Sequence, residues 1–430
     1  MRTILAAFAY LASVNLVIAS PANAAPKLAN LPEVRATPAI IGGLAVLPLK
    51  VPSPRADGKI VVGLSNGVER ETTINPELQA ILTAFIAERG SPIATVLVAD
   101  AKTGDVLAMA EGRSPEAWGG TTHTALHPKF PTASLFKTVV TSAAFEIADF
   151  DPEVPIGLMG GCGNVEPSGL WMNDHIVGQN HMTMRRAYGH SCNSFFAKMA
   201  VNTLGLGVIS DFARKFGFGQ QPLADFYIEP GTIVAPTPAT SSTYTVGRYA
   251  AGFGMVSTSA AHVATTMLAI ANDGKRVPLR FFRDSPAAAP PAEPYGQMIE
   301  PLTAQKIRKI MEATVRGGTA SFAFNRGKPR RLREITGGKT GTLMGRSPLG
   351  LTTLFSGMMP IENPEIVVAS IVVLEDHWII KAPSLAAEAL SAWVELKEKN
   401  GVMTTAGELT RDRKYLRDSA PRRRKAQGRT

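Results

Sequence analysis

Residues 92–110 read PIATVLVADAKTGDVLAMA, and their pattern decides the fold class. Residues 93–100 form an apolar run that is rich in β-branched side chains, and residues 106–110 form a second apolar run. The residues between them, Lys102-Thr103-Gly104-Asp105, have the composition of a turn. Two such runs joined by a turn predict a β-hairpin.

Further elements are predicted on both sides of this hairpin. Before it, Asn75 as N-cap and Pro76 as the first helical residue predict the start of a helix. Far after it, residues 352–359 and 366–374 are predicted strands, and residues 383–399 are a predicted amphipathic helix. A helix, a hairpin, a long helical middle, two strands and a last helix indicate an α+β fold, in which helices cover an antiparallel sheet.

The composition excludes several classes of protein. The chain has 430 residues, of which 45% are hydrophobic and only 19% are charged, and this excludes a disordered protein. Its 39 glycines and 31 prolines follow no period, which excludes a collagen-like chain, and two cysteines are too few for a disulfide-dense scaffold. Only one apolar run approaches the length of about 18 residues that a membrane helix needs, which excludes a multi-span membrane protein.

The net charge of +10 is concentrated at the C-terminus. Residues 411–430 contain nine Lys or Arg and two Asp, and so carry +7 of this charge. Basic character is therefore a property of the predicted tail, residues 401–430, and we expect no nucleic-acid partner for the fold. The tail is expected to be a solvated, disordered segment; the alternative is a tether to an anionic envelope or membrane surface.

The N-terminus has the features of a secretory signal. Arg2 is followed by a mostly apolar, uncharged run, and Ala22-Asn23-Ala24 provides a small-x-small cleavage pattern. Residues 1–24 are therefore predicted to be a signal peptide, with an uncleaved membrane anchor as the alternative, and the protein is expected in the periplasm or elsewhere outside the cytoplasm. Residues 25–64 are predicted to be a Pro-rich linker and residues 65–400 one folded domain.

Three short motifs carry the candidate chemistry, and the first is Ser134-Leu135-Phe136-Lys137. It opens an apolar helical segment, and residues i and i+3 lie on the same face of a helix. A lysine desolvated there loses affinity for its proton and can accept the proton of Ser134. The start of the helix also presents free N–H groups to a developing oxyanion. Taken alone, this motif occurs by chance in many chains.

The other two motifs add a polar pair and a cation. Ser191-Cys192-Asn193 lies in a predicted helix over residues 184–204 and offers a hydroxyl and a carboxamide, which alone could be a satisfied buried hydrogen-bond site. Gly337-Gly338-Lys339-Thr340-Gly341-Thr342 surrounds a lysine with glycines and hydroxyls, which suits a carboxylate ligand.

Two competing site types are disfavoured. A phosphate-binding loop needs a glycine five residues before Gly338, and the sequence has Arg333 there. His123 and His127 have a spacing that metals use, but no carboxylate or cysteine is close enough in sequence to complete a ligand set. We therefore expect neither a metal nor a cofactor.

In their order and spacing, the three motifs resemble those of the penicillin-binding transpeptidase family, which has the serine β-lactamase-like fold. The resemblance covers roughly residues 65–400 and includes residues 92–110 as the opening hairpin. It implies a helical subdomain inserted beside the antiparallel sheet. It also implies catalytic roles: Ser134 as acyl nucleophile with Lys137 as its general base, and Ser191 as a proton relay that Lys339 tunes.

The resemblance implies substrate-binding roles as well. Asn193 is expected to hold the substrate amide, and Thr340, Gly341 and Thr342 to bind a terminal carboxylate. Backbone N–H groups of Ser134 and Thr342 are expected to form the oxyanion hole. The implied protein is an exported serine D,D-transpeptidase or D,D-peptidase of peptidoglycan stem peptides, inhibited by β-lactam antibiotics.

Two alternative functions stay open on the same fold. One is a β-lactamase, and the other is a non-catalytic envelope-binding module. No Glu-x-x-Leu-Asn pattern is present, and Ser191-Cys192-Asn193 stands where one β-lactamase class has Ser-x-Val, so both observations favour the peptidase. The intact motifs argue against the binding module.

Two cysteines lie near the second motif. Cys192 fills its variable position, and Cys162 precedes it by 30 residues. An oxidising compartment permits a disulfide between them. The alternative is a buried thiol beside the serine.

Overall fold

The computed structural model describes residues 40–41, 43–47, 51–64, 67–91, 93–113, 123–127, 130–163, 165–173, 181–237, 239–285, 296–346, 348–374, 380–402, 404 and 407–408. All of them belong to the larger of the two units into which the chain divides, Pro38–Thr430. The predicted signal peptide and nearly all of the predicted basic tail lie outside the described residues, and both stay predictions. Within these ranges, no helix combines the length and the apolar character that crossing a bilayer requires.

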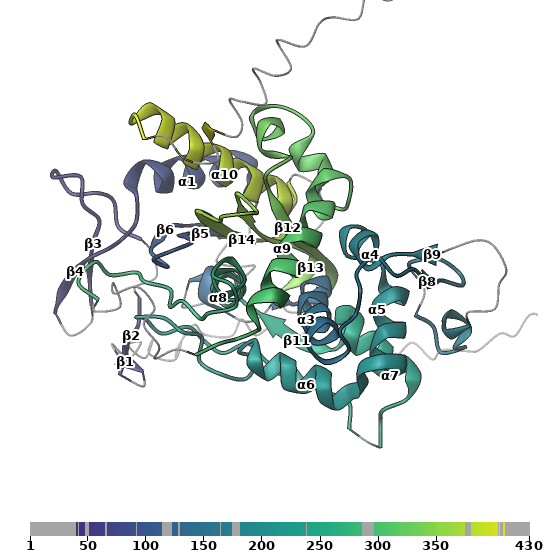
Figure 1. Cartoon of the computed structure of the whole chain (residues 1–430). Helices are drawn as coiled ribbons and strands as arrows, with labels where there is room; N and C mark the ends of the chain where they lie inside the picture. Colours follow the sequence, from purple (N-terminus) through teal and green to yellow (C-terminus); the bar gives the residue numbers. More distant parts are fainter. Residues whose placement is uncertain are drawn as a thin grey trace, which may run out of the picture. The chain divides into compact units, whose positions relative to one another are not determined.

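A five-stranded antiparallel sheet lies at the centre of the unit, in the order β12-β13-β14-β5-β6 (Figure 1). Its strands are β5 (Ile93–Asp100), β6 (Val106–Arg113), β12 (Gly337–Arg346), β13 (Leu349–Met359) and β14 (Ile366–Leu374). The predicted hairpin is the β5–β6 pair and the two predicted later strands are β13 and β14, so the α+β fold class is confirmed. Because β14 pairs with β5, segments from both ends of the domain join in one sheet, and β12 lies at its edge.

Helices, short strand pairs and a small three-stranded sheet, β10-β11-β7, surround this central sheet. The α-helices are α1 (Pro76–Arg89), α3 (Lys137–Ile147), α4 (Met184–His190), α5 (Asn193–Met199), α6 (Gly205–Lys215), α7 (Thr243–Arg248), α8 (Ala260–Ala271), α9 (Pro301–Arg316) and α10 (Ala382–Lys399). The short strands are β1 (Ile40–Ile41), β2 (Leu44–Ala45), β3 (Val61–Gly63), β4 (Glu69–Glu71), β7 (Phe130–Pro131), β8 (Ile156–Gly157), β9 (His181–Met182), β10 (Ile233–Val234) and β11 (Met255–Thr258).

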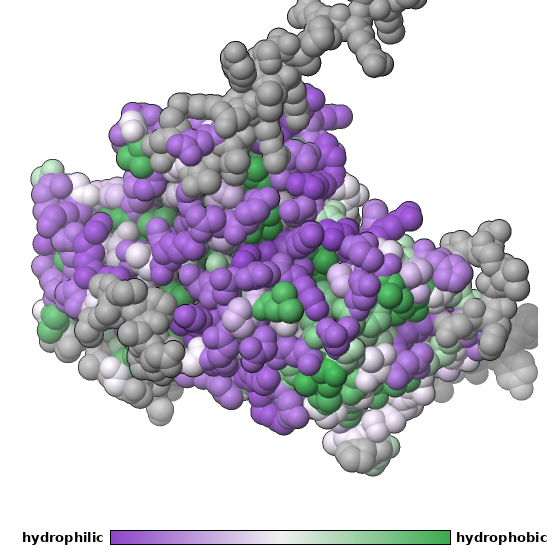
Figure 2. All heavy atoms as spheres, viewed as in Figure 1, coloured by the Kyte–Doolittle hydropathy of each residue, from purple (hydrophilic) through white to green (hydrophobic). Residues whose placement is uncertain are grey.

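Both faces of the sheet are buried, and the side-chain alternation of each strand divides its residues between two cores. In β5, Leu97 and Ala99 belong to the core that includes α3 and α8, whereas Val96 and Val98 belong to the core that includes α1 and α10. Figure 1 shows α1 and α10 side by side, with α8 across the sheet from them. The molecular face in Figure 2 is mainly hydrophilic, which agrees with apolar side chains being gathered in these cores. Two-sided burial explains why β5 is a continuous apolar run.

The helix predicted before the hairpin is α1, and its ends follow from local chemistry. The side chain of Asn75 accepts a hydrogen bond from the backbone N–H of Leu78 at 2.9 Å, and Pro76 follows this N-cap. Gly90, with a φ of 59°, ends the helix in the left-handed conformation that glycine adopts easily. The last predicted helix, residues 383–399, is α10.

Part of the range predicted as a linker is packed against the core. Strands β3 and β4 form an antiparallel pair, and Ile60 and Val62 are 2% and 0% exposed. Buried and more exposed residues alternate from Ile60 to Leu64, as in a strand with one buried face. The end of the range 25–64 is therefore part of the folded unit, and the other domain boundaries stay predictions.

We expect Leu97→Ala to lower the free energy of unfolding by about 2–5 kcal/mol, because the side chain is fully buried in the centre of the sheet. Leu349→Ala is the matched control: its side chain is 72% exposed, so the expected change is within about 0.5 kcal/mol. Urea titration of the two variants and the unsubstituted protein measures both values. Equal losses in the two variants would contradict the described register of the sheet.

Candidate active site

Ser134 and Lys137 lie on one helical turn, as the sequence predicts. The turn η2 (Ala133–Phe136) is a 3₁₀ helix that continues into α3 at Lys137. In a 3₁₀ turn, the side chains of residues i and i+3 eclipse each other. The Nζ atom of Lys137 therefore lies 2.8 Å from the Oγ atom of Ser134.

Ser191 does not lie inside a continuous helix, which corrects the prediction for residues 184–204. Helix α4 ends just before Ser191, whose φ is 58°, and α5 begins at Asn193. This left-handed residue breaks the helix in the way that a glycine often does, but the residue at the break is a serine. The carbonyl oxygen of Ser191 accepts a hydrogen bond from the Nζ atom of Lys137 at 2.8 Å.

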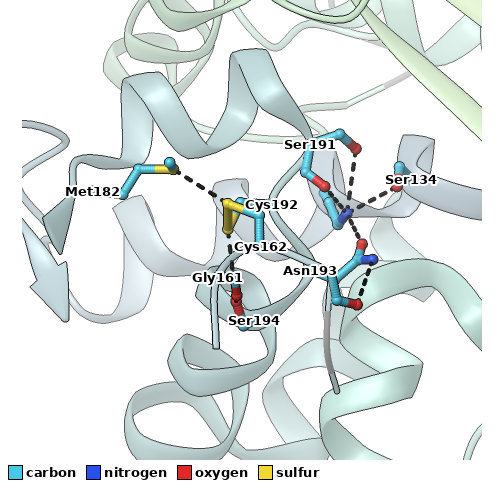
Figure 3. The surroundings of a disulfide bond; sticks show 10 residues. Ser134, Gly161, Cys162, Met182, Ser191, Cys192, Asn193 and Ser194 are labelled. Atoms are coloured by element: carbon cyan, nitrogen blue, oxygen red, sulfur yellow. Dashed lines mark hydrogen bonds between the residues drawn. A yellow bond between two sulfur atoms is a disulfide. The ribbon is translucent and has the colours of Figure 1, made fainter. Parts of the chain in front are cut away.

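The amine of Lys137 is the point at which the first two motifs meet. Besides Ser134 and the Ser191 carbonyl, its Nζ atom contacts Asn193 Oδ1 at 2.6 Å and Ser191 Oγ at 3.3 Å. Figure 3 shows the side chains of Ser134, Ser191 and Asn193 converging on this amine. The segments come from η2, from the α4–α5 junction and from the start of α5, so tertiary packing brings them together.

The third motif completes the cluster from the edge strand β12. The Nζ atom of Lys339 donates to Ser191 Oγ at 2.9 Å and to the carbonyl oxygen of Thr340 at 3.0 Å. The hydroxyl of Ser191 thus lies between two lysine amines, that of Lys339 and that of Lys137. A hydroxyl in this position can accept a proton from one amine and donate one to the other.

Burial controls the charge of both amines. Lys137 and Lys339 are 0% exposed. Burial, and then the nearby charge of Lys339, lower the pKa of Lys137 well below its ordinary value. Burial also lowers the pKa of Lys339 to about 7. The lowered pKa favours the neutral form of the Lys137 amine, and a neutral amine can accept a proton.

A cleft of about 250 Å³ lies over the cluster. Six of the eight predicted site residues line it: Ser134, Ser191, Asn193, Thr340, Gly341 and Thr342. Lys137 and Lys339 do not line it but lie buried and bonded to residues that do. The structure thus brings together all eight residues that the sequence singles out.

Several lining residues were not predicted: Phe253, Thr319, Phe322, Thr353, Lys381 and Pro383. Thr319 hydrogen-bonds through its side chain to the hydroxyl of Thr340. Thr319 follows two glycines, Gly317 and Gly318. A pair of glycines is a weak local signal that two backbone segments approach each other closely. A Cβ atom at Gly318 would lie 2.1 Å from the carbonyl oxygen of Gly189, so these two segments touch. Phe322, Lys381 and Pro383 belong to no recognisable motif.

The cysteines and the two histidines each have defined contacts. Cys162 and Cys192 form a disulfide, so Cys192 is not a free thiol beside the serine. His123 pairs with Glu111, and His127 pairs with Glu229, so the two histidines have separate partners. Across the described residues, no cluster of three or more His, Cys, Asp or Glu is arranged to hold a metal ion.

A family model matches most of the folded unit. Residues 94–391 match the model of the penicillin binding protein transpeptidase domain. This span contains all three motifs, the cysteine pair and the five strands of the sheet except the first residue of β5.

Curated relatives show the same similarity over part of their length. PbpC of Pseudomonas aeruginosa, a probable peptidoglycan D,D-transpeptidase, is 25% identical over 334 residues, which are 75% of this chain and 55% of the relative. The penicillin-binding protein PbpB of Mycobacterium tuberculosis is 27% identical over 305 residues, which are 65% of this chain and 43% of the relative. The chain spans about half the length of the curated relatives it matches.

Solved structures share the fold. The TP domain of penicillin-binding protein 3 from Burkholderia pseudomallei has a TM-score of 0.62 and 23% identity, over 78% of this chain and 97% of that one. Penicillin-binding protein 3 of Mycobacterium tuberculosis in complex with aztreonam has a TM-score of 0.58 and 23% identity, over 81% of each chain.

We expect the free energy of unfolding to rise with pH above about 7. Lys339 loses its proton near pH 7 in the folded protein and only at higher pH in the unfolded chain, so the unfolded chain binds more protons in between. Each such proton contributes about 1.4 kcal/mol per pH unit. Urea titrations at pH 7, 8 and 9 measure the slope, which should be smaller in Lys339→Met. Identical slopes in the two proteins would contradict a low pKa for Lys339.

Proposed function

Because the chain belongs to the penicillin binding protein transpeptidase domain family, we propose that it is a serine D,D-transpeptidase or D,D-peptidase that acts on peptidoglycan stem peptides. The observation that carries this proposal is the contact between Ser134 and the buried amine of Lys137, at 2.8 Å. A hydroxyl becomes a nucleophile when a neighbouring base takes its proton. The low pKa of Lys137 makes this amine such a base.

The other contacts of Lys137 orient its lone pair. A neutral amine has two N–H groups and one lone pair. The carbonyl oxygen of Ser191 and the Oδ1 atom of Asn193 can only accept hydrogen bonds, so they take the two N–H groups. The lone pair then faces Ser134 Oγ and accepts its proton. Ser134 Oγ attacks the carbonyl carbon of the D-Ala–D-Ala bond, and backbone N–H groups of Ser134 and Thr342 stabilise the oxyanion.

Breakdown of the tetrahedral intermediate needs a proton for the leaving amine. Ser191 supplies it, because its hydroxyl contacts both Lys137 and Lys339 and can be reprotonated by either. The C–N bond breaks, D-Ala leaves as the amine, and the acyl group stays on Ser134 Oγ. Attack by an amine of a second stem peptide completes transpeptidation, whereas attack by water completes hydrolysis.

Residues of β12 bind the substrate carboxylate in this proposal. Thr340 and Thr342 line the cleft, and the buried Nζ atom of Lys339 donates to the carbonyl oxygen of Thr340. A Cβ atom at Gly341 would lie 3.2 Å from the carbonyl oxygen of Thr132 and 3.3 Å from the Cβ atom of Ala133. Glycine therefore lets β12 approach the turn that carries Ser134, and Asn193 holds the substrate amide across the cleft.

The proposed inhibitors and compartment follow from the same chemistry. Solved relatives from Mycobacterium tuberculosis are complexed with aztreonam and with ampicillin. A β-lactam amide can acylate Ser134 as the peptide does, so we expect β-lactams to inhibit this protein. The peptidoglycan substrate lies outside the cytoplasm, and the Cys162–Cys192 disulfide fits an oxidising, extracytoplasmic compartment.

The decisive experiment is the intact mass of the protein after incubation with benzylpenicillin, followed over hours. We expect one penicilloyl adduct that persists, and none in Ser134→Ala. Ser142→Ala is the matched control: Ser142 lies on α3, where its hydroxyl donates to the carbonyl of Thr138, away from the cleft, so this variant should form the adduct normally.

The other outcomes favour the two alternatives. An adduct that forms and then disappears, while penicillin is consumed, would replace the peptidase with a β-lactamase. No adduct in the folded protein would favour a binding module. Stem-peptide assays with and without an acceptor amine then separate transpeptidation from hydrolysis.

We expect Lys137→Arg to slow penicillin acylation by on the order of 10²–10⁴-fold, because a guanidinium stays protonated and cannot act as a base. Stopped-flow acylation rates from pH 6 to pH 9 measure the effect, and circular dichroism checks that the variant is folded. A folded variant that acylates at the unsubstituted rate would exclude Lys137 as the base.

A further inference from the structure

The disulfide joins the second motif to a neighbouring loop (Figure 3). Cys192 lies between the two residues whose oxygens accept from Lys137, Ser191 and Asn193. A displacement of the Cys192 backbone therefore moves both oxygens. Cys192 is 0% exposed, and its partner Cys162 lies 30 residues away in sequence.

The loop on the other side of the disulfide, residues 161–163, caps helix α5. The backbone N–H of Asn193 donates to the carbonyl of Cys162 at 2.8 Å, and the hydroxyl of Ser194 donates to the carbonyl of Gly161 at 2.7 Å. The N-cap residue Cys192 makes no side-chain capping bond, so the loop supplies acceptors that the start of the helix lacks. The loop thus serves as an external cap.

The same loop also orients the amide of Asn193. The Nδ2 atom of Asn193 donates to the carbonyl of Gly163 at 3.4 Å, while its Oδ1 atom faces Lys137 at 2.6 Å. The carbonyl of Gly163 can only accept, so it selects the rotamer in which the amide oxygen points to the amine. The amide of Asn193 therefore links the 161–163 loop to the amine of Lys137.

We propose that the Cys162–Cys192 disulfide is a positioning element of the active site, which holds the 161–163 loop against α5 and thereby keeps Ser191 and Asn193 on Lys137. This inference rests on the proposed function. Gly160 and Gly161 have φ values of 75° and 81°. Glycine has few restrictions on its backbone angles, so this loop can move when the disulfide is lost. Two thiols cannot stay at bonding distance, so reduction moves the two Sγ atoms apart and leaves only hydrogen bonds to hold the loop against the helix.

The proposal makes acylation dependent on the oxidation state. The disulfide forms by exchange with a disulfide donor, in which the two thiols of this chain become a disulfide and the donor leaves as two thiols. Reduction by a dithiol reverses this: the protein disulfide takes up two electrons and two protons, and the dithiol closes to a cyclic disulfide. A displacement of about 1 Å at a catalytic group can cost on the order of 10²-fold in rate. We expect acylation to slow at least about tenfold.

The test compares the oxidised chain, the dithiothreitol-reduced chain and Cys162→Ala/Cys192→Ala. Benzylpenicillin titrations by stopped flow separate the acylation step from binding, and melting temperatures and circular dichroism report the fold. Met182→Leu is the matched control. Met182 contacts Cys162 Sγ at 3.7 Å, and replacing it leaves both cysteines, and so the disulfide, in place. The chain has two cysteines, so the double variant also shows whether the reductant acts anywhere else.

We expect the reduced chain and the double variant to stay folded and to acylate at least about tenfold more slowly in the acylation step. Met182→Leu should acylate normally, the reductant should not affect the double variant, and reoxidation should restore the reduced chain. A lower melting temperature with an unchanged acylation rate would overturn the proposal and leave a stabilising role only. If the double variant fails to fold, the reduced chain decides. Failure of the oxidised protein to form a Ser134 adduct refutes the proposed function instead.

Discussion

The burial of one amine, that of Lys137, is the constraint on which the rest of the site depends. A charged ammonium without solvent is costly, so burial favours the neutral form, and a neutral amine needs defined partners. Those partners lie 54 and 56 residues away along the chain, in Ser191 and Asn193. The packing that lowers the pKa of Lys137 therefore also sets the position of Ser134, the proposed nucleophile.

The sheet supplies the rigid frame for this arrangement. Strand β12 pairs with β13 over its whole length, and β13 is in turn paired with β14, so Lys339 and the threonines beside it have fixed positions. The turn η2 packs against β12, where Gly341 permits the close approach. Side chains on such paired strands are held more precisely than side chains on loops. The 161–163 loop lies outside this sheet, and the disulfide acts there together with hydrogen bonds to the start of α5.

Local signals account for the parts of the structure that were predicted correctly. The β5–β6 hairpin and α1 follow from apolar runs, a turn and an N-cap, which act over a few residues. The helix break at Ser191 was missed because a serine rarely adopts a positive φ, and its contacts with Lys137 and Lys339 come from distant parts of the chain. The packed end of the linker range, around Val62, was missed because short strands carry a weak pattern.

The sequence by itself determined the α+β class and singled out eight residues that the structure brings together, because strand alternation, helix capping and short motifs are properties of neighbouring residues. Only the tertiary structure decided that Cys162 bonds to Cys192, that both lysines are buried, and that Phe322 and Lys381 line the same cleft as Ser134. The physical reason is that burial, a lowered pKa and a disulfide each depend on groups brought together through space. Their separation along the chain leaves no periodic or local trace of that contact.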